Sequence, residues 1–147
     1  SCGDYGPVGN LQPMVLREVL HAHIPVLTPE STVRDAVDKM DIYQFPALVV
    51  VDANAYPIAV VTEGDLARGV MQRGNLTSLG DEPAHIHGTR EPTVASADTE
   101  VSDALHLMLM SGLSILPIID ESRLCGVVLR CDLMQAMLMD ALALPSE

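Results

Sequence analysis

Tryptophan is absent from this 147-residue chain, and Phe45 is its only phenylalanine, so aromatic residues make up 3% of the sequence. Basic residues are also scarce, because 8 lysines and arginines stand against 20 acidic side chains and the formal net charge is −12. Proteins that bind nucleic acid or an anionic membrane surface depend on a cationic face. The charge balance therefore disfavours both kinds of partner.

Long hydrophobic runs are missing as well. Proline, glycine or a charged residue interrupts every apolar run well before the roughly 20 residues that a membrane-spanning helix needs. No segment resembles a secretory signal. The three cysteines, Cys2, Cys125 and Cys131, are odd in number and have no C-x-x-C spacing, which favours reduced thiols in a cytoplasmic protein.

Sequence signatures of catalysis are not found either. A nucleophile needs a base and an orienting group, and the chain has neither a nucleophile elbow nor a glycine-rich phosphate loop. We therefore expect no catalytic residues, no resident cofactor and no enzyme activity.

The most informative feature that is present is an internal repeat. Val26 matches Val94 at an offset of 68, and the match continues to Asp52 and Asp120. Beyond these turns the offset becomes 67, as in Asp65 and Asp132. This repeat is explained most simply by two related units that bury a shared face. Residues on that face are the first candidates for a ligand site.

Hydrophobic periodicity predicts the same order of elements in each unit. In the first unit, Ser31 and Thr32 are good N-cap residues before a helical pattern of apolar positions. β-Branched runs that flank an Asp-containing turn then predict two strands, and a second helical pattern follows. The segments are a helix-compatible stretch 14–20, an extended stretch 24–27, a helix from 33, strands 47–51 and 58–61 and a helix 63–73, then an extended stretch 92–94, a helix from 101, strands 115–119 and 124–129 and a helix 130–142.

The domain boundaries follow from this pattern. A flexible lead-in, 1–13, precedes repeat one at 14–75; a linker at 76–90 leads to repeat two at 91–142, and a tail at 143–147 ends the chain. The eight methionines fall mostly on helix faces, where they are flexible packing material for a core with few aromatics.

The pattern resembles the paired CBS domain, named after cystathionine β-synthase and also called a Bateman module. The resemblance covers residues 14–142 and rests on PVLTPESTVRDAVDKM and PTVASADTEVSDALHLM, the strands FPALVVVD and SILPIID, and the closing segments AVVTEGDLARGV and GVVLRCDLMQAM. It implies an α+β fold in which two pseudo-symmetric β-α-β-β-α repeats form one module, strands against strands and helices outside.

The resemblance also implies a ligand signature, a Thr or Ser followed three residues later by Asp where a strand turns into the last helix. A carboxylate there can accept bonds from ribose hydroxyls, while the hydroxyl and the first helix amides face a phosphate. Thr62 and Asp65 complete the signature in repeat one. Repeat two keeps Asp132 but has Leu129 in place of the hydroxyl, so Arg130 would have to supply the phosphate contact. The alternative for both Asp residues is a favourable place in the helix dipole.

Two clefts between the repeats follow from the same resemblance. The apolar residues would sandwich a flat base, and backbone groups would bond its edge. In one cleft Thr62 and Asp65 would face Thr93, Val94, Ser114, Ile115 and Pro117; in the other Arg130 and Asp132 would face Ile24, Pro25, Val26, Phe45, Pro46 and Ala47.

These features predict a regulatory module that senses an adenosine-containing small molecule such as AMP, ADP, ATP or S-adenosylmethionine. An alternative is a structural dimerisation module with vestigial clefts. A second alternative is a metal-binding protein that uses the pairs His21/His23 and His85/His87, since two histidines at i and i+2 can chelate a metal. No acidic or thiolate residue adjoins either pair, so we expect that no metal is bound.

We also expect a homodimer. The last helix carries apolar residues on more than one face, too many for a single packing partner. These residues are Leu133, Met134, Met137, Leu138 and Met139.

Overall fold

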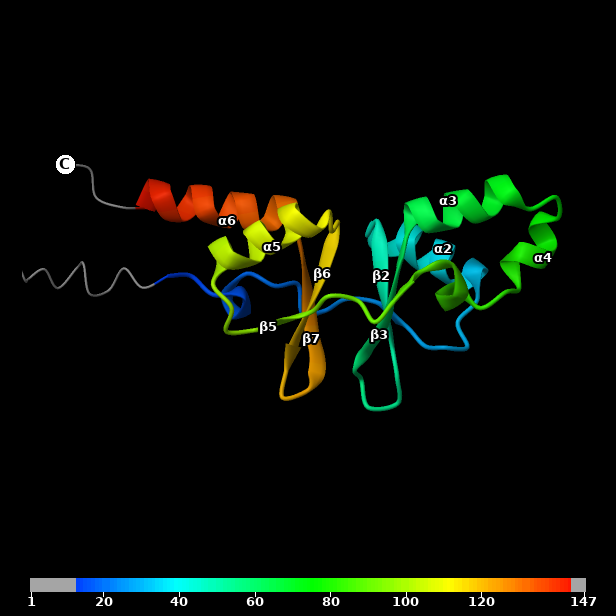
Figure 1. The fold of residues 1–147 in the computed structure, drawn as a ribbon, viewed down its shortest axis with the longest axis horizontal. Coiled ribbons are helices and arrows are strands. Elements are labelled where there is room, and N and C mark those ends of the chain that lie inside the picture. Colours follow the sequence, from blue (N-terminus) through cyan, green and yellow to red (C-terminus); the bar gives the residue numbers. More distant parts are fainter. Residues whose placement is uncertain (1–12, 144–147) are drawn as a thin grey trace, which may run out of the picture.

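Two small sheets lie side by side at the centre of the molecule, and helices flank them on the outer sides (Figure 1). The computed structural model describes residues 13–143. The α+β fold of two related repeats is confirmed, including the arrangement of strands inside and helices outside.

Repeat one holds a sheet of four strands in the order β1-β2-β3-β4, in which β1 is parallel to β2 and the other neighbours are antiparallel. The hairpin β2–β3 is flanked by α2 and α3, and α4 follows (Figure 1). The bounds are β1 Val26–Leu27, α2 Val33–Tyr43, β2 Ala47–Val51, β3 Pro57–Thr62, α3 Glu63–Gln72, α4 Leu76–Gly80, the 3₁₀ helix η2 Ala84–His87 and β4 Thr89–Arg90.

Repeat two holds a sheet of three strands in the order β5-β6-β7, with β5 parallel to β6 and β6 antiparallel to β7. The bounds are β5 Ala95–Ser96, α5 Val101–Ser111, β6 Ile115–Asp120, β7 Arg123–Leu129 and α6 Arg130–Ala143. A 3₁₀ helix from the start of the chain, η1 Leu16–Glu18, packs on this repeat, since its Leu16 belongs to the core of α5, β6 and α6.

Local sequence explains where the first helix of each repeat starts and stops. Thr32 caps α2, because its Oγ1 accepts the Asp35 N–H (3.1 Å) and Asp35 Oδ2 accepts the Thr32 N–H (2.9 Å). The backbone turns left-handed just after α2 at Gln44 (φ 59°) and just after α5 at Gly112 (φ 63°). Gln44 and Gly112 are 68 residues apart, so the repeat extends to its helix ends.

Alternation along β2 divides the core into layers. Leu48 and Val50 face the helices of repeat one, whereas Ala47 and Val49 face the other repeat. There they meet Ile115 and Val127 in a core that both sheets share. We call this cluster the inter-repeat core. It positions the two repeats and therefore any cleft between them.

Several short segments differ from the sequence-based expectation. The helix expected over 14–20 is shortened to η1, and the predicted linker 76–90 contains α4, η2 and β4, which pairs with β3. Leu133 was expected among surplus surface residues but is fully buried in the core of repeat two. The predicted lead-in 1–13 and tail 143–147 lie outside the described residues, apart from Pro13 and the backbone of Ala143. Within 13–143 no helix is both long and apolar enough to cross a bilayer.

Candidate functional site

The junction of β3 and α3 places Thr62 and Asp65 at the first turn of a helix. Thr62 Oγ1 accepts the Asp65 N–H (3.0 Å), and Asp65 Oδ2 accepts the Thr62 N–H (2.9 Å). Arg68, one turn further along α3, donates to Asp65 Oδ1. Asp65 is buried, whereas the Arg68 side chain is two-thirds exposed. The signature residues therefore form the cap of α3, and both carboxylate oxygens already have a partner.

Thr62 also lines a cavity of about 210 Å³ between the repeats, which we call the first cleft. The cavity brings together Thr62, Thr93, Ser114 and Ile115, as the resemblance implied. Its full lining is Val60, Thr62, Thr89, Glu91, Pro92, Thr93, Gly112, Leu113, Ser114 and Ile115. Sites for drug-sized ligands usually measure about 300–1,000 Å³. The first cleft is thus smaller than the usual site for a ligand of that size.

Three predicted members of the first cleft are not part of its lining. Asp65 lies behind Thr62 in the capping box, Val94 immediately precedes β5, and Pro117 is buried within β6. The lining adds Thr89 and Glu91, which sequence reasoning missed. Thr89 could have been found from the repeat, because at the 68-residue offset it corresponds to His21.

The junction of β7 and α6 is built differently. Asp132 Oδ2 accepts the Leu129 N–H (2.9 Å), so half of the cap persists without the hydroxyl. The same oxygen lies 2.8 Å from His21 Nε2. The His21 ring meets Phe45 edge to face, with ring centroids 5.6 Å apart and an angle of 83° between the planes. His21 was considered in the sequence as a metal ligand, and the structure places it on the carboxylate of the second site instead.

The predicted partners of Asp132 separate into three groups. Ile24, Pro25, Phe45 and Ala47 close around the inter-repeat core, and the space between them has no room for a water molecule. Arg130 and Pro46 line a different cavity of about 440 Å³, which we call the helix-side cavity, with Leu109, Ser114, Leu129, Cys131 and Met134. Val26 is held in β1, paired with Val49.

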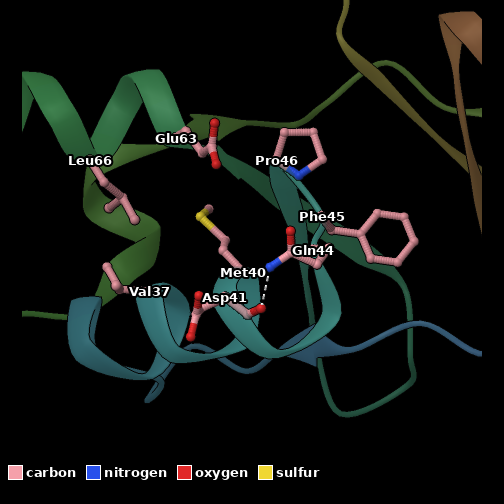
Figure 2. Close-up of a pocket in the computed structure, with 8 residues that line it drawn as sticks. All are labelled: Val37, Met40, Asp41, Gln44, Phe45, Pro46, Glu63 and Leu66. Carbon is pink, nitrogen blue, oxygen red and sulfur yellow. Dashed lines mark hydrogen bonds between the residues drawn. The ribbon is translucent and has the colours of Figure 1, made fainter.

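A further cavity of about 370 Å³ opens between α2 and α3 (Figure 2). Met40 points into it from α2, Glu63 and Leu66 reach it from α3, and Phe45 points away from it (Figure 2). Gln44 Nε2 donates to the Asp41 carbonyl at its edge (2.6 Å). This cavity belongs to repeat one alone and contains no group that the ligand signature uses.

The histidine pairs do not converge. His21 contacts Asp132, whereas His87 Nε2 lies 2.9 Å from Glu82 Oε1 in repeat one. Within residues 13–143, no three His, Cys, Asp or Glu side chains are grouped so that they could hold a metal ion.

Comparison with known proteins follows the same division into repeats. The family model for the CBS domain matches twice, at residues 16–72 and 85–139. The uncharacterized 17.7 kDa protein in the bps2 3′ region of Acidianus ambivalens is 30% identical over 122 residues, which are 82% of this chain and 71% of that protein. The chain matches six curated relatives and covers between 22% and 71% of their length.

Solved structures share the fold at low sequence identity. CBSX2 of Arabidopsis thaliana in complex with AMP superposes with a TM-score of 0.72 and 23% identity, over 85% of this chain and 96% of that one. The CBS domain pair of protein MJ0100 in complex with 5′-methylthioadenosine and S-adenosyl-L-methionine gives a TM-score of 0.71 and 19% identity, over 87% of this chain and 98% of that one.

Proposed function

Because the chain belongs to the CBS-domain family and carries the domain twice, we propose that it is a regulatory module that binds an adenosine-containing small molecule in the first cleft. The observation that supports this most is the cavity between the repeats at the N-terminal end of α3, where Thr62, Thr93 and Ser114 offer hydroxyl groups beside apolar residues. We also propose that the protein is cytoplasmic and has no catalytic activity. Its ligand classes are AMP, ADP, ATP and S-adenosylmethionine, of which AMP and S-adenosyl-L-methionine are present in the two related structures.

Each part of such a ligand finds a matching group. Leu113 and Ile115 provide apolar contact for the base, and the positive end of the α3 dipole favours a phosphate near Thr62. A carboxylate has about four lone-pair sites, and we propose that Asp65, which lies behind Thr62, accepts a ribose hydroxyl on Oδ1 once Arg68 has turned away from it. The exposed Arg68 side chain is long enough to turn from Asp65 towards the ligand's anionic group.

The charges around the cleft favour ligands with little negative charge. Glu91 lines the first cleft, Glu63 begins α3, and the chain as a whole carries −12. Three phosphates would be repelled by these carboxylates more than one. We therefore propose that AMP or S-adenosylmethionine binds more tightly than ATP.

The decisive experiment is calorimetric titration of the unmodified protein and of Asp65→Ala with AMP and S-adenosylmethionine. Loss of a charged hydrogen-bond acceptor costs about 1.5 to 3 kcal/mol, so affinity should fall roughly ten-fold or more. The matched control is Asp35→Ala, which removes the same kind of capping carboxylate from α2, away from the cleft. Its affinity should be unchanged.

Two results would contradict the proposal. If AMP, S-adenosylmethionine, ADP and ATP, all titrated in this way, fail to bind the unmodified protein, the module is structural and does not sense these ligands. If Asp65→Ala binds as tightly as the parent while remaining folded, Asp65 has no part in recognition and serves α3 alone.

A further inference from the structure

The two clefts differ at one pair of equivalent positions, Thr89 and His21. Thr89 pairs antiparallel with Val60 on β3, and His21 pairs antiparallel with Val127 on β7. Val60 and Val127 correspond at the 67-residue offset, so these two antiparallel pairings, which we call the backbone crossings, are equivalent in the two repeats. Thr89 lines the open first cleft. His21 has a longer side chain with a ring nitrogen that can reach a carboxylate.

That ring occupies the place where a ligand would engage the second signature. His21 Nε2 lies 2.8 Å from Asp132 Oδ2, the oxygen that also accepts the Leu129 N–H. Phe45 supports the ring from the side in an edge-to-face contact. Asp132 Oδ2 therefore already has two partners, so a ribose hydroxyl could bond this oxygen only by taking the place of the imidazole.

The position of His21 is built into the backbone. Its N–H donates to the Val127 carbonyl (2.9 Å), and the Val127 N–H donates back to the His21 carbonyl (3.1 Å). Gly126 allows this close crossing, because a Cβ there would lie 2.5 Å from the His21 carbonyl oxygen and 2.7 Å from Leu20 Cδ1. Two backbone bonds and a required glycine fix the segment that carries the ring.

The neighbouring space is closed as well. Around Ile24, Pro25 and Phe45 no water-sized volume is left, whereas the equivalent first cleft measures about 210 Å³. Phe45 itself replaces Leu113 of the first cleft at the 68-residue offset. Phe45, which is bulkier than Leu113, packs against the His21 ring, so these two side chains together fill the second cleft from within the chain.

We propose that His21 closes the second cleft, so that the module binds one adenosine ligand per chain and the residue at position 21 sets the occupancy of the second cleft. This inference rests on the proposed function, because it concerns the regulation of the same kind of site. The two repeats are then unequal: Asp65 is held by the mobile end of the exposed Arg68 side chain, whereas Asp132 is held by a histidine whose backbone is paired with Val127.

The test replaces a residue of the second cleft with its equivalent from the first cleft. His21→Thr installs the residue found at the equivalent position 89, and calorimetric titration with AMP should change from one ligand per chain to two. His106→Thr is the matched control, since His106 is exposed on α5 and lines neither cleft; it should keep one ligand. The added site should disappear again in the double variant His21→Thr/Asp132→Ala.

The outcomes separate this inference from the proposed function. If the unmodified protein binds no adenosine ligand, the proposed function fails. If it binds two, or if folded His21→Thr still binds one, the closure by His21 is wrong while the proposed function stands. A ligand-free measurement gives a second check: the ¹⁵N resonance of His21 Nε2 should move in Asp132→Asn and not in Asp98→Asn. An unchanged resonance in Asp132→Asn would also overturn the inference.

Discussion

Cys125 and Cys131 differ in their surroundings although they are six residues apart. Cys125 lies in β7 against the core of repeat two, and burial raises the pKa of its thiol, with a smaller contribution from the nearby Asp120 carboxylate. Cys131 is exposed in the first turn of α6 and lines the helix-side cavity. The thiolate is the reactive form of cysteine. Exposure and pKa therefore both make Cys125 the less reactive of the two.

We expect iodoacetamide at pH 8 to alkylate Cys131 several-fold faster than Cys125 in the folded protein. The measurement is the rate of modification of each peptide by mass spectrometry after quenching at timed intervals. In urea the two rates should converge, which serves as the control for intrinsic differences between the sites. Faster modification of Cys125 in the folded state would contradict the partial burial of its side chain.

At the scale of elements, one ion cluster connects η1 to repeat two. Arg17 Nη1 donates to Asp120 Oδ2 at the end of β6 (2.9 Å), and its Nη2 donates to Asp98 Oδ1 before α5 (3.1 Å). These bonds raise the pKa of Arg17, and the guanidinium lowers the pKa of Asp120 below its usual range. Because the groups are exposed, their contribution is screened by solvent and salt.

The sign of the resulting pH dependence follows from the lowered pKa of Asp120. A carboxyl group with a depressed folded-state pKa stabilises the fold above its unfolded value, which is about 3.9, and loses that contribution as the pH falls through the folded value. In urea unfolding at pH 7, 4 and 3, Asp120→Asn should lose less stability towards acid than the parent. Asp38→Asn, at an exposed site on α2, should retain the acid dependence of the parent. Parallel pH curves for Asp120→Asn and the parent would show that the cluster contributes nothing.

The elements that sequence predicted well are those whose pattern is local. The helices α2 and α5 and the hairpin strands β2, β3, β6 and β7 each carry enough apolar positions to define a period. β4 escaped prediction because it has only two residues and depends on a distant partner, Val60 for Thr89. The helix expected over 14–20 was predicted too long, since only η1 forms there. The contact of His21 with Asp132 spans 111 residues, so no local pattern could indicate it.

At the scale of the whole molecule, the helices leave apolar side chains uncovered. On α5 and α6, Leu109, Met110, Leu138 and Met139 are each more than half exposed. The hairpin turns project on the side of the molecule opposite α3 and α6 (Figure 1). Exposed apolar side chains on two helices that pack together are typical of an interaction site. We propose that a second copy of the chain covers α5 and α6.

We expect a dimer in light scattering at tens of micromolar protein, and Leu138→Glu should convert it to a monomer, because a buried unpaired charge is costly at an interface. The control is Ala53→Glu, which adds the same charge at the exposed turn between β2 and β3. It should remain dimeric. A parent protein that is monomeric at this concentration would contradict the proposed homodimer.

The backbone crossings of Val60 with Thr89 and of Val127 with His21 place their glycines on different segments. In repeat two the close approach is relieved by Gly126 on the hairpin, whereas in repeat one it is relieved by Gly88 on the connecting segment, where a Cβ would lie 2.4 Å from the Val60 carbonyl oxygen. The glycine thus stands on opposite partners of the same crossing. A chimera that joined the hairpin of repeat one to the N-terminal segment of repeat two would bring Ala59 against Leu20 with no glycine on either side. The two halves share an architecture, but the different positions of their glycines mean that these segments cannot be exchanged between them.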